Sequence, residues 1–249
     1  MAAITFSPKT STPSSESDSV TVSAEIIEAP QSKAIAVAQP RPSGSNITRD
    51  DIVFPRINLV QKSGKLCDDF APGTFLFEKQ VVLAKPGDEF VAVVLDDKKY
   101  FQEKVEYGSP DFGQRAENEE EVRAKGGTVT WGIPDRPYYQ SVADFLMAIP
   151  APAGATQEQL DTFPFIDKSG THWAMAIYTV AASAYTSLAK RIFTDKLYTL
   201  KDGLHLGEYR IHSELKRNAA NSWYVPVTGM PRRYNDADKA KFFTELKGN

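Results

Sequence analysis

From about residue 51 onward, apolar and polar positions alternate in short runs that predict a chain built mainly of β-strands. The runs are rich in Val, Ile, Phe and Tyr and are separated by Pro-Gly or Asn-containing turns. The predicted strands are RINLVQ (56–61), APGTFLFEKQVVL after its Pro-Gly turn (71–83), EFVAVVLDDKKYFQEKV (89–105), THWAMAIYTVA (171–181), GLHLGEYRIHSELKRN (203–218) and NSWYVPV (221–227).

The run at 89–105 changes character halfway along. Its first half is apolar on both faces, which predicts a central strand. Its second half alternates, and this places Lys98, Tyr100, Gln102 and Lys104 on one face.

Two segments have helical periodicity instead. SAYTSLAKRIFTDKL (183–197) predicts a helix capped by Ser183. A second, short helix is expected to begin at Asn235 or Asp236. The apolar stripe of the first helix consists of Tyr185, Leu188, Ala189, Ile192 and Phe193.

This order of elements predicts a mainly β fold with few helices. It fits an embellished five-stranded oligonucleotide/oligosaccharide-binding (OB) barrel, with a helix before the final hairpin and a C-terminal helix. A β-sandwich or another α+β sheet would give a similar string. Residues 1–50 are dominated by Ser, Thr, Pro and Ala, which predicts a low-complexity, disordered arm. Residues 51–249 are then one domain, with an insertion at about 106–165.

The final predicted hairpin carries two adjacent aromatic residues between basic pairs. Neighbours in a strand point to opposite faces, so Trp223 is expected to enter the core with Val225. Tyr224 then shares the other face with Pro226, which cannot donate a ladder hydrogen bond and so favours an edge strand.

The net charge of -3 gives no global sign of nucleic-acid binding, but the charge is unevenly distributed. Residues 161–234 contain ten cations and six acids, whereas residues 88–125 contain six cations and eleven acids. A single cysteine and three histidines make a disulfide framework or a Cys/His metal site improbable, and no cofactor is expected. No apolar run is long enough to span a membrane and no secretory leader is visible, so a cytoplasmic protein is expected.

Enzyme signatures are scarce. The sequence has no phosphate-binding glycine loop, zinc-protease helix motif or nucleophile elbow, so a non-catalytic protein is predicted. Asp96, Asp97 and Lys99 vaguely resemble a nuclease string, but adjacent acids in a strand diverge and no partner glutamate follows at a useful position.

Aromatic residues interleave with the cations of the basic half, which is typical of single-strand binding. Cations follow the phosphates, and rings stack on unpaired bases. Each residue taken alone also fits a plainer role in core packing or on a solvated face. The predicted DNA-binding residues are Lys98, Lys99, Tyr100, Trp131, Tyr139, Lys190, Arg191, Arg210, Lys216, Arg217, Tyr224, Arg232 and Arg233.

Several stretches resemble bacteriophage-type single-stranded DNA-binding proteins. They are FPRINLVQKSG, APGTF and DEFVAVVLDDKKYFQE near the start, then AIYTVAASAYTSLAKRI, and finally ELKRNAANSWYVPV. The resemblance covers roughly residues 50–245 with gaps, and its motifs are short. It implies an OB barrel that coats single-stranded DNA in phage replication or recombination, with no catalytic set. Many such proteins end in an acidic tail that recruits replication partners, whereas this chain ends in TELKGN.

Two other functions remain open. The low-complexity arm could wrap a neighbouring subunit in a phage structural or assembly protein, and a metal-dependent nuclease would use Asp96 and Asp97. The binding hypothesis expects single-stranded DNA as the main partner. It leaves open replication or recombination proteins as further partners, and self-association.

Overall fold

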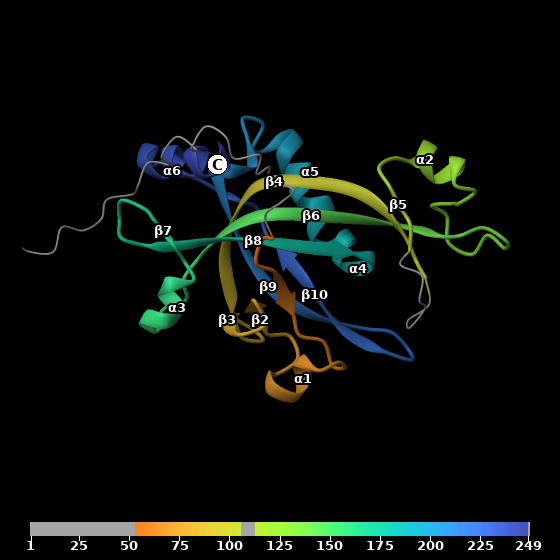
Figure 1. Cartoon of the computed structure of the whole chain (residues 1–249), viewed down its shortest axis with the longest axis horizontal. Helices are drawn as coiled ribbons and strands as arrows, with labels where there is room; N and C mark the ends of the chain where they lie inside the picture. Colours follow the sequence, from red (N-terminus) through yellow and green to blue (C-terminus); the bar gives the residue numbers. More distant parts are fainter. Residues whose placement is uncertain (1–52, 106–112, 249) are drawn as a thin grey trace, which may run out of the picture. The chain divides into compact units, whose positions relative to one another are not determined.

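The computed structural model describes residues 53–105 and 113–248, which form a mainly β fold as predicted (Figure 1). The predicted arm, residues 1–50, lies outside the described residues.

All the strand ladders of the described residues are antiparallel. A small sheet has the order β1 (Ile57–Leu59), β2 (Phe75–Phe77), β3 (Val81–Ala84). The large sheet has the order β10 (Ser222–Thr228), β9 (Gly207–Arg217), β4 (Glu89–Glu103), β6 (Tyr139–Pro150), β8 (His172–Ala181), β7 (Phe165–Ile166). In addition, β5 (Arg115–Ala116) pairs with β4, and β11 (Arg232–Arg233) pairs with β9.

Strand β4 is the central strand that its apolar first half predicts. Its first residues pair with β9, where Phe90 lies opposite Ile211. From Val93 onward it pairs with β6, and the register shifts once, between Val94 and Asp96. A long strand that pairs with two different neighbours in turn can bend the sheet around a core, and a bulge adds to that bend.

Apolar side chains cover both faces of the large sheet. Phe145, Tyr209 and Leu188 belong to the larger core, and all are fully buried. The second core lies under α6 (Ala237–Gly248), where Phe243 packs edge-on against Trp173 with ring centroids 4.9 Å apart. Because both faces are covered near the start of β4, an open face for a ligand must lie elsewhere along the strand.

The predicted mid-chain helix forms, but it begins differently. It is a continuous run of α4 (Ala182–Ala184), a π-helical turn (Tyr185–Ala189) and α5 (Lys190–Tyr198), and the predicted apolar stripe faces the core. The prediction of a Ser183 cap is wrong, because Ala181 occupies the cap position and makes no side-chain bond. The Ser183 hydroxyl accepts a hydrogen bond from the Trp223 indole instead, at 2.9 Å.

Residues 71–83 form two strands rather than one. β2 and β3 make a tight hairpin whose turn contains Glu78 and Lys79 at φ values of 51° and 62°. These left-handed values are uncommon in residues other than glycine, so neither residue type signals a turn in the sequence.

The described strands do not close into a barrel. No ladder joins β10 to β8 in the described part of the chain, and other segments lie along their edges. The Ile177 amide of β8 donates to the Pro55 carbonyl at 2.7 Å. The Ser187 hydroxyl donates to the Pro226 carbonyl of β10 at 2.8 Å. The mainly β class is thus confirmed, whereas a closed five-stranded barrel is not seen.

The predicted insertion, about 106–165, needs correction. Its middle part is β6, which lies in the large sheet between β4 and β8. On either side of β6, β5 pairs with β4, and the other described residues leave the sheet and contain α2 (Glu119–Ala124) and α3 (Gln157–Asp161). The remaining short elements are α1 (Leu66–Asp69) and a 3-10 turn (Leu204–Leu206). In the part of the chain that the structure describes, no helix has the length and apolar character that a membrane crossing requires.

Candidate nucleic-acid interface

One face of the β4–β6 hairpin collects polar, cationic and aromatic side chains. Directly opposed residues of antiparallel strands share a face, and the register pairs Lys98 with Asp144, Tyr100 with Val142, and Gln102 with Gln140. The Lys104 amide continues this register by donating to the Tyr138 carbonyl at 2.8 Å. The prediction that Lys98, Tyr100, Gln102 and Lys104 share a face is therefore confirmed. We define the β4–β6 face as Lys98, Tyr100, Gln102, Lys104, Tyr138, Gln140, Val142 and Asp144, with Arg115 and Trp131 packed on it.

The far end of this face carries an open aromatic group. Trp131 is 69% exposed and meets the edge of Tyr138, with ring centroids 5.0 Å apart. The Lys104 ammonium lies 4.7 Å from the centre of the indole ring. Two backbone bonds, from the Tyr139 amide to Thr128 and from the Thr128 amide to Pro137, hold this loop on the hairpin. A ring that is exposed and close to a cation suits stacking on a base beside a phosphate.

Tyr100, in the middle of the face, is covered rather than open. It is only 5% exposed, because the Arg115 guanidinium lies 4.8 Å from the centre of its ring. Burial raises the pKa of Tyr100, and the Asp144 carboxylate, which accepts a hydrogen bond from the tyrosine hydroxyl, raises it further. Asp144 also accepts a bond from the Thr179 hydroxyl at 2.6 Å. The expectation that a base stacks directly on Tyr100 is therefore wrong for this arrangement.

The reverse side of the hairpin is a small core. Tyr139 is 1% exposed and packs with Phe101, Ala116 and Val122. Burial raises the pKa of its hydroxyl. The prediction of Tyr139 as a stacking residue is corrected, because its ring supports the arm that contains α2. Lys99 lies on this reverse side, with its ammonium 5.1 Å from the centre of the Phe101 ring.

The β9–β10 hairpin holds the predicted basic residues in contact with acids. Arg210 pairs with Glu89, and Lys216 pairs with Glu214 at 2.8 Å. Arg217 is exposed near the hairpin tip. Exposed ion pairs are weak, so these cations remain able to exchange partners.

Tyr224 and Trp223 are both half-buried, which differs from the predicted inside–outside division. The Tyr224 ring packs on the Pro-Gly turn before β2, where a Cβ on Gly73 would lie 2.6 Å from it. Trp223 stays outside the core and bonds to Ser183. Tyr224 thus has a packing role. Its direct cross-strand neighbour is Leu215 of β9, which lies on the same face.

The remaining predicted cations lie on other elements. Lys190 and Arg191 belong to α5, and the Arg191 guanidinium makes two bonds of 2.9 and 3.1 Å to Asp195, which is 1% exposed. Arg232 and Arg233 form β11 beside the first residues of β9. The Arg233 guanidinium pairs with Asp202 at 3.1 Å. The predicted DNA-binding residues therefore do not gather on one face.

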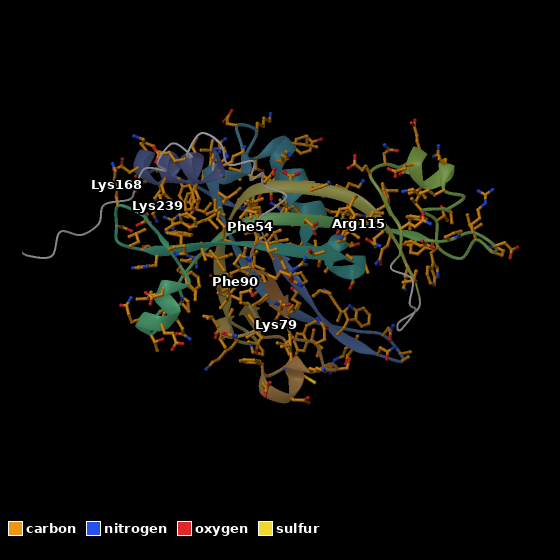
Figure 2. All side chains as sticks on the ribbon, viewed as in Figure 1. Phe54, Lys79, Phe90, Arg115, Lys168 and Lys239 are labelled. Atoms are coloured by element: carbon orange, nitrogen blue, oxygen red, sulfur yellow. The ribbon has the colours of Figure 1, made fainter. Side chains whose placement is uncertain are left out.

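Arg115, Tyr138, Lys104 and Arg56 lie on or near the β4–β6 face and were not among the predicted DNA-binding residues. Arg115 and Tyr138 lay within the stretch read as an insertion, and Lys104 was placed on the face without being assigned a role. Arg56 of the segment before β1 bridges to Ile177 and is exposed, and its charge acts on the Tyr100 hydroxyl. In Figure 2, Arg115 lies at the opposite end of the β4–β6 strands from Lys168 and Lys239.

The predicted nuclease string takes part in ordinary surface contacts. Both carboxylate oxygens of Asp97 accept bonds from the Lys196 ammonium, at 2.7 and 3.0 Å. The Asp97 amide donates to the Asp96 carboxylate at 2.9 Å. Among the described residues, no group of three or more His, Cys, Asp or Glu side chains is arranged to hold a metal ion.

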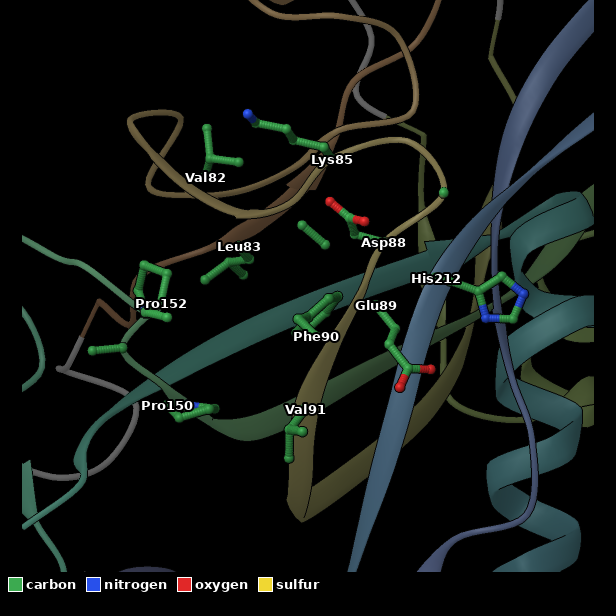
Figure 3. A pocket seen from close by; sticks show the side chains of 14 residues that line it. Val82, Leu83, Lys85, Asp88, Glu89, Phe90, Val91, Pro150, Pro152 and His212 are labelled. Carbon is green, nitrogen blue, oxygen red and sulfur yellow. The ribbon is translucent and has the colours of Figure 1, made fainter.

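An open pocket of about 780 Å³ lies apart from this face, between the β3–β4 turn and the loop after β6 (Figure 3). Its walls combine apolar residues, among them Leu83, Phe90 and Pro152, with the charged residues Lys85, Asp88 and Glu89, and His212 stands at one side. None of the thirteen predicted DNA-binding residues lines it. Comparisons of the chain with known protein families, with characterised proteins and with solved structures gave no match.

Proposed function

We propose that this protein binds single-stranded DNA along the β4–β6 face, without catalysis. The observation that carries the proposal is the arrangement of Trp131, Tyr138 and Lys104 beside Arg115 and Tyr100 on one side of the β4–β6 hairpin. Aromatic and guanidinium planes offer stacking surfaces to any unpaired base, and the cations among them offer contacts to phosphates.

The cations of the β4–β6 face favour binding of a polyanion, although residues 88–125 contain more acids than cations. Lys98 pairs with Glu117 at 3.6 Å, and both side chains are mostly exposed, so a phosphate can replace the glutamate at little cost. Lys104 contacts an aromatic ring. In the described part of the chain, no ion pair joins Arg115 or Lys104 to a carboxylate.

The fold supports the same proposal. We interpret the strand order β8-β6-β4-β9-β10, with a helix between β8 and β9, as an OB barrel in which β4, β6, β8, β9 and β10 are the first to fifth strands and the third and fifth do not pair. On this interpretation, the β1 segment and the helix that starts at Ala182 fill the opening. The far end of the β4–β6 hairpin is then the connection between the first and second barrel strands, one of the two loops through which OB barrels bind oligonucleotides.

The biological setting is proposed from the sequence resemblance. The protein would coat single strands during phage replication or recombination in the host cytoplasm. Replication or recombination proteins and further copies of the chain would be its partners.

A fluorescence titration of the full chain with a poly-dT oligonucleotide, repeated at two salt concentrations, tests the proposal. Binding is expected to quench tryptophan emission and to weaken steeply as salt rises, because counterions are released on binding. Absence of quenching together with absence of salt-sensitive binding would contradict it.

A further inference from the structure

We propose that the outer surface of the Arg115 guanidinium is the platform on which a base stacks at the centre of the β4–β6 face. This inference rests on the proposed function. It replaces Tyr100, which sequence patterning favours, with a residue from the short strand β5.

The geometry leaves the guanidinium as the accessible plane. Tyr100 is 5% exposed, so a base cannot reach its ring while Arg115 covers it. Arg115 itself is exposed. One surface of its side chain lies over the tyrosine, which leaves the opposite surface for a ligand.

Hydrogen bonds hold the guanidinium in this position before any ligand arrives. Arg115 pairs with Gln102 across the β4–β5 ladder, and its Nε donates to the Gln102 Oε1 at 3.1 Å. The Gln102 amide is fixed in turn by donating to the Gly113 carbonyl. Gln102 also lies opposite Gln140 of β6, so one row across three strands carries Arg115, Gln102 and Gln140.

The chemistry of arginine fits this place. A guanidinium is planar and delocalised, so it can stack on an aromatic ring with one surface and on a base with the other. Lysine keeps the charge but lacks the plane. The two amides beside Arg115 can bond to the edge of the stacked base. The ligand class inferred for this position is therefore an unpaired base, rather than a phosphate or a base pair.

The test compares Arg115→Lys with the unsubstituted full chain, using a poly-dT oligonucleotide and an abasic sugar-phosphate strand of equal length. We expect Arg115→Lys to weaken dT binding by about tenfold, the loss of one stacking contact, and to leave abasic binding unchanged. Arg123→Lys is the matched control, since Arg123 is an exposed arginine on α2 that pairs with Glu119. Equal thermal unfolding midpoints establish that each variant is folded.

Two outcomes overturn the inference while leaving the proposed function intact. Arg115→Lys could bind dT as tightly as the unsubstituted chain, or it could lose the same factor for the dT and abasic strands, which identifies a phosphate contact. If the unsubstituted chain binds neither strand, the proposed function itself fails, and this inference with it.

Discussion

The side chain of Gln61 makes both hydrogen bonds of a β-bridge with the backbone of Tyr224. Its amide nitrogen donates to the Tyr224 carbonyl at 3.0 Å, and its oxygen accepts from the Tyr224 amide at 3.0 Å. An edge strand with unpaired backbone groups is a template for self-association. Gln61 therefore satisfies part of the β10 edge that a closed barrel would have paired with another strand.

Gln61→Ala is expected to lower the free energy of unfolding by about 1–2 kcal/mol, because two partly buried backbone groups lose their partners. Chemical denaturation measures this change, and light scattering should show increased self-association. Gln80→Ala is the control, since Gln80 is exposed and makes no side-chain hydrogen bond to the described residues. Equal stabilities of the two variants would show that the bridge contributes nothing.

Lys98 and Lys99 are neighbours on opposite faces of β4, which makes them a matched pair. Lys98→Ala is expected to reduce the slope of log affinity against log salt by about 0.7, the value for one phosphate contact with a single strand. Lys99→Ala should leave the slope unchanged, because Lys99 lies on the reverse side against Phe101. Titrations at four salt concentrations give the slopes. If Lys99→Ala changed the slope more than Lys98→Ala, the bound DNA would lie on the reverse side of the hairpin, which would contradict the prediction.

Trp131→Ala is expected to weaken oligonucleotide binding by about 1–3 kcal/mol, the contribution of one stacked base. Stability should change little because the ring is 69% exposed. Tyr198→Ala removes a similarly exposed ring from the end of α5 and serves as the control. The prediction fails if both substitutions weaken binding equally, or if neither does.

Asp167 stabilises the β7–β8 turn in a pH-dependent way. Burial raises the pKa of its carboxyl, but the hydrogen bonds that it accepts outweigh burial and hold the pKa below its ordinary value of 3.8. The carboxylate is thus favoured in the folded state, so its contribution is complete above pH 3.8 and is lost as the pH falls through the lowered pKa. The donors are the Ser169 amide and hydroxyl, the Thr171 amide and the Trp173 indole, at 2.8, 2.6, 3.0 and 3.1 Å.

Asp167→Asn should therefore be less stable than the unsubstituted chain at pH 7 and approach it in stability near pH 2. Asp167→Ala should cost on the order of 2–4 kcal/mol at pH 7, since buried donors are left unpaired. Thermal unfolding at several pH values measures both differences. A gap between Asp167→Asn and the unsubstituted chain that does not change with pH would rule out the carboxylate charge as the cause.

Most strands could be predicted from alternation because each has a buried side. The apolar first half of β4 indicated a central strand, and the stripe at Leu188 and Ile192 indicated a core-facing helix. The β2–β3 turn was missed because Glu78 and Lys79 adopt left-handed φ values without a glycine. β6 was taken as part of an insertion because sequence alone does not show which distant strand pairs with β4.

The interface was harder to predict than the fold. Counting charges directed attention to the basic half of the chain, yet Lys98, Lys104 and Arg115, the cations of the β4–β6 face, come from the stretch that is acidic by count. The register separates Lys98 from Lys99, and a cross-strand contact brings Arg115 over Tyr100. Such relations depend on pairing between strands, which neither periodicity nor local composition specifies. Tyr224 was predicted as a stacking residue because it lies between two basic pairs, whereas its ring packs against Gly73 and the neighbouring Trp223 donates to Ser183.

Hydroxyl-radical footprinting of the full chain, with and without a saturating poly-dT oligonucleotide, tests the location of the proposed site most directly. Three exposed and reactive side chains report on different surfaces: Trp131, at 69% exposure, is on the β4–β6 face, and Tyr198 and Met230, both at 74%, are not. We expect the oligonucleotide to protect Trp131 from oxidation and to leave Tyr198 and Met230 unchanged. Protection of Tyr198 or Met230 with undiminished oxidation of Trp131 would contradict the account.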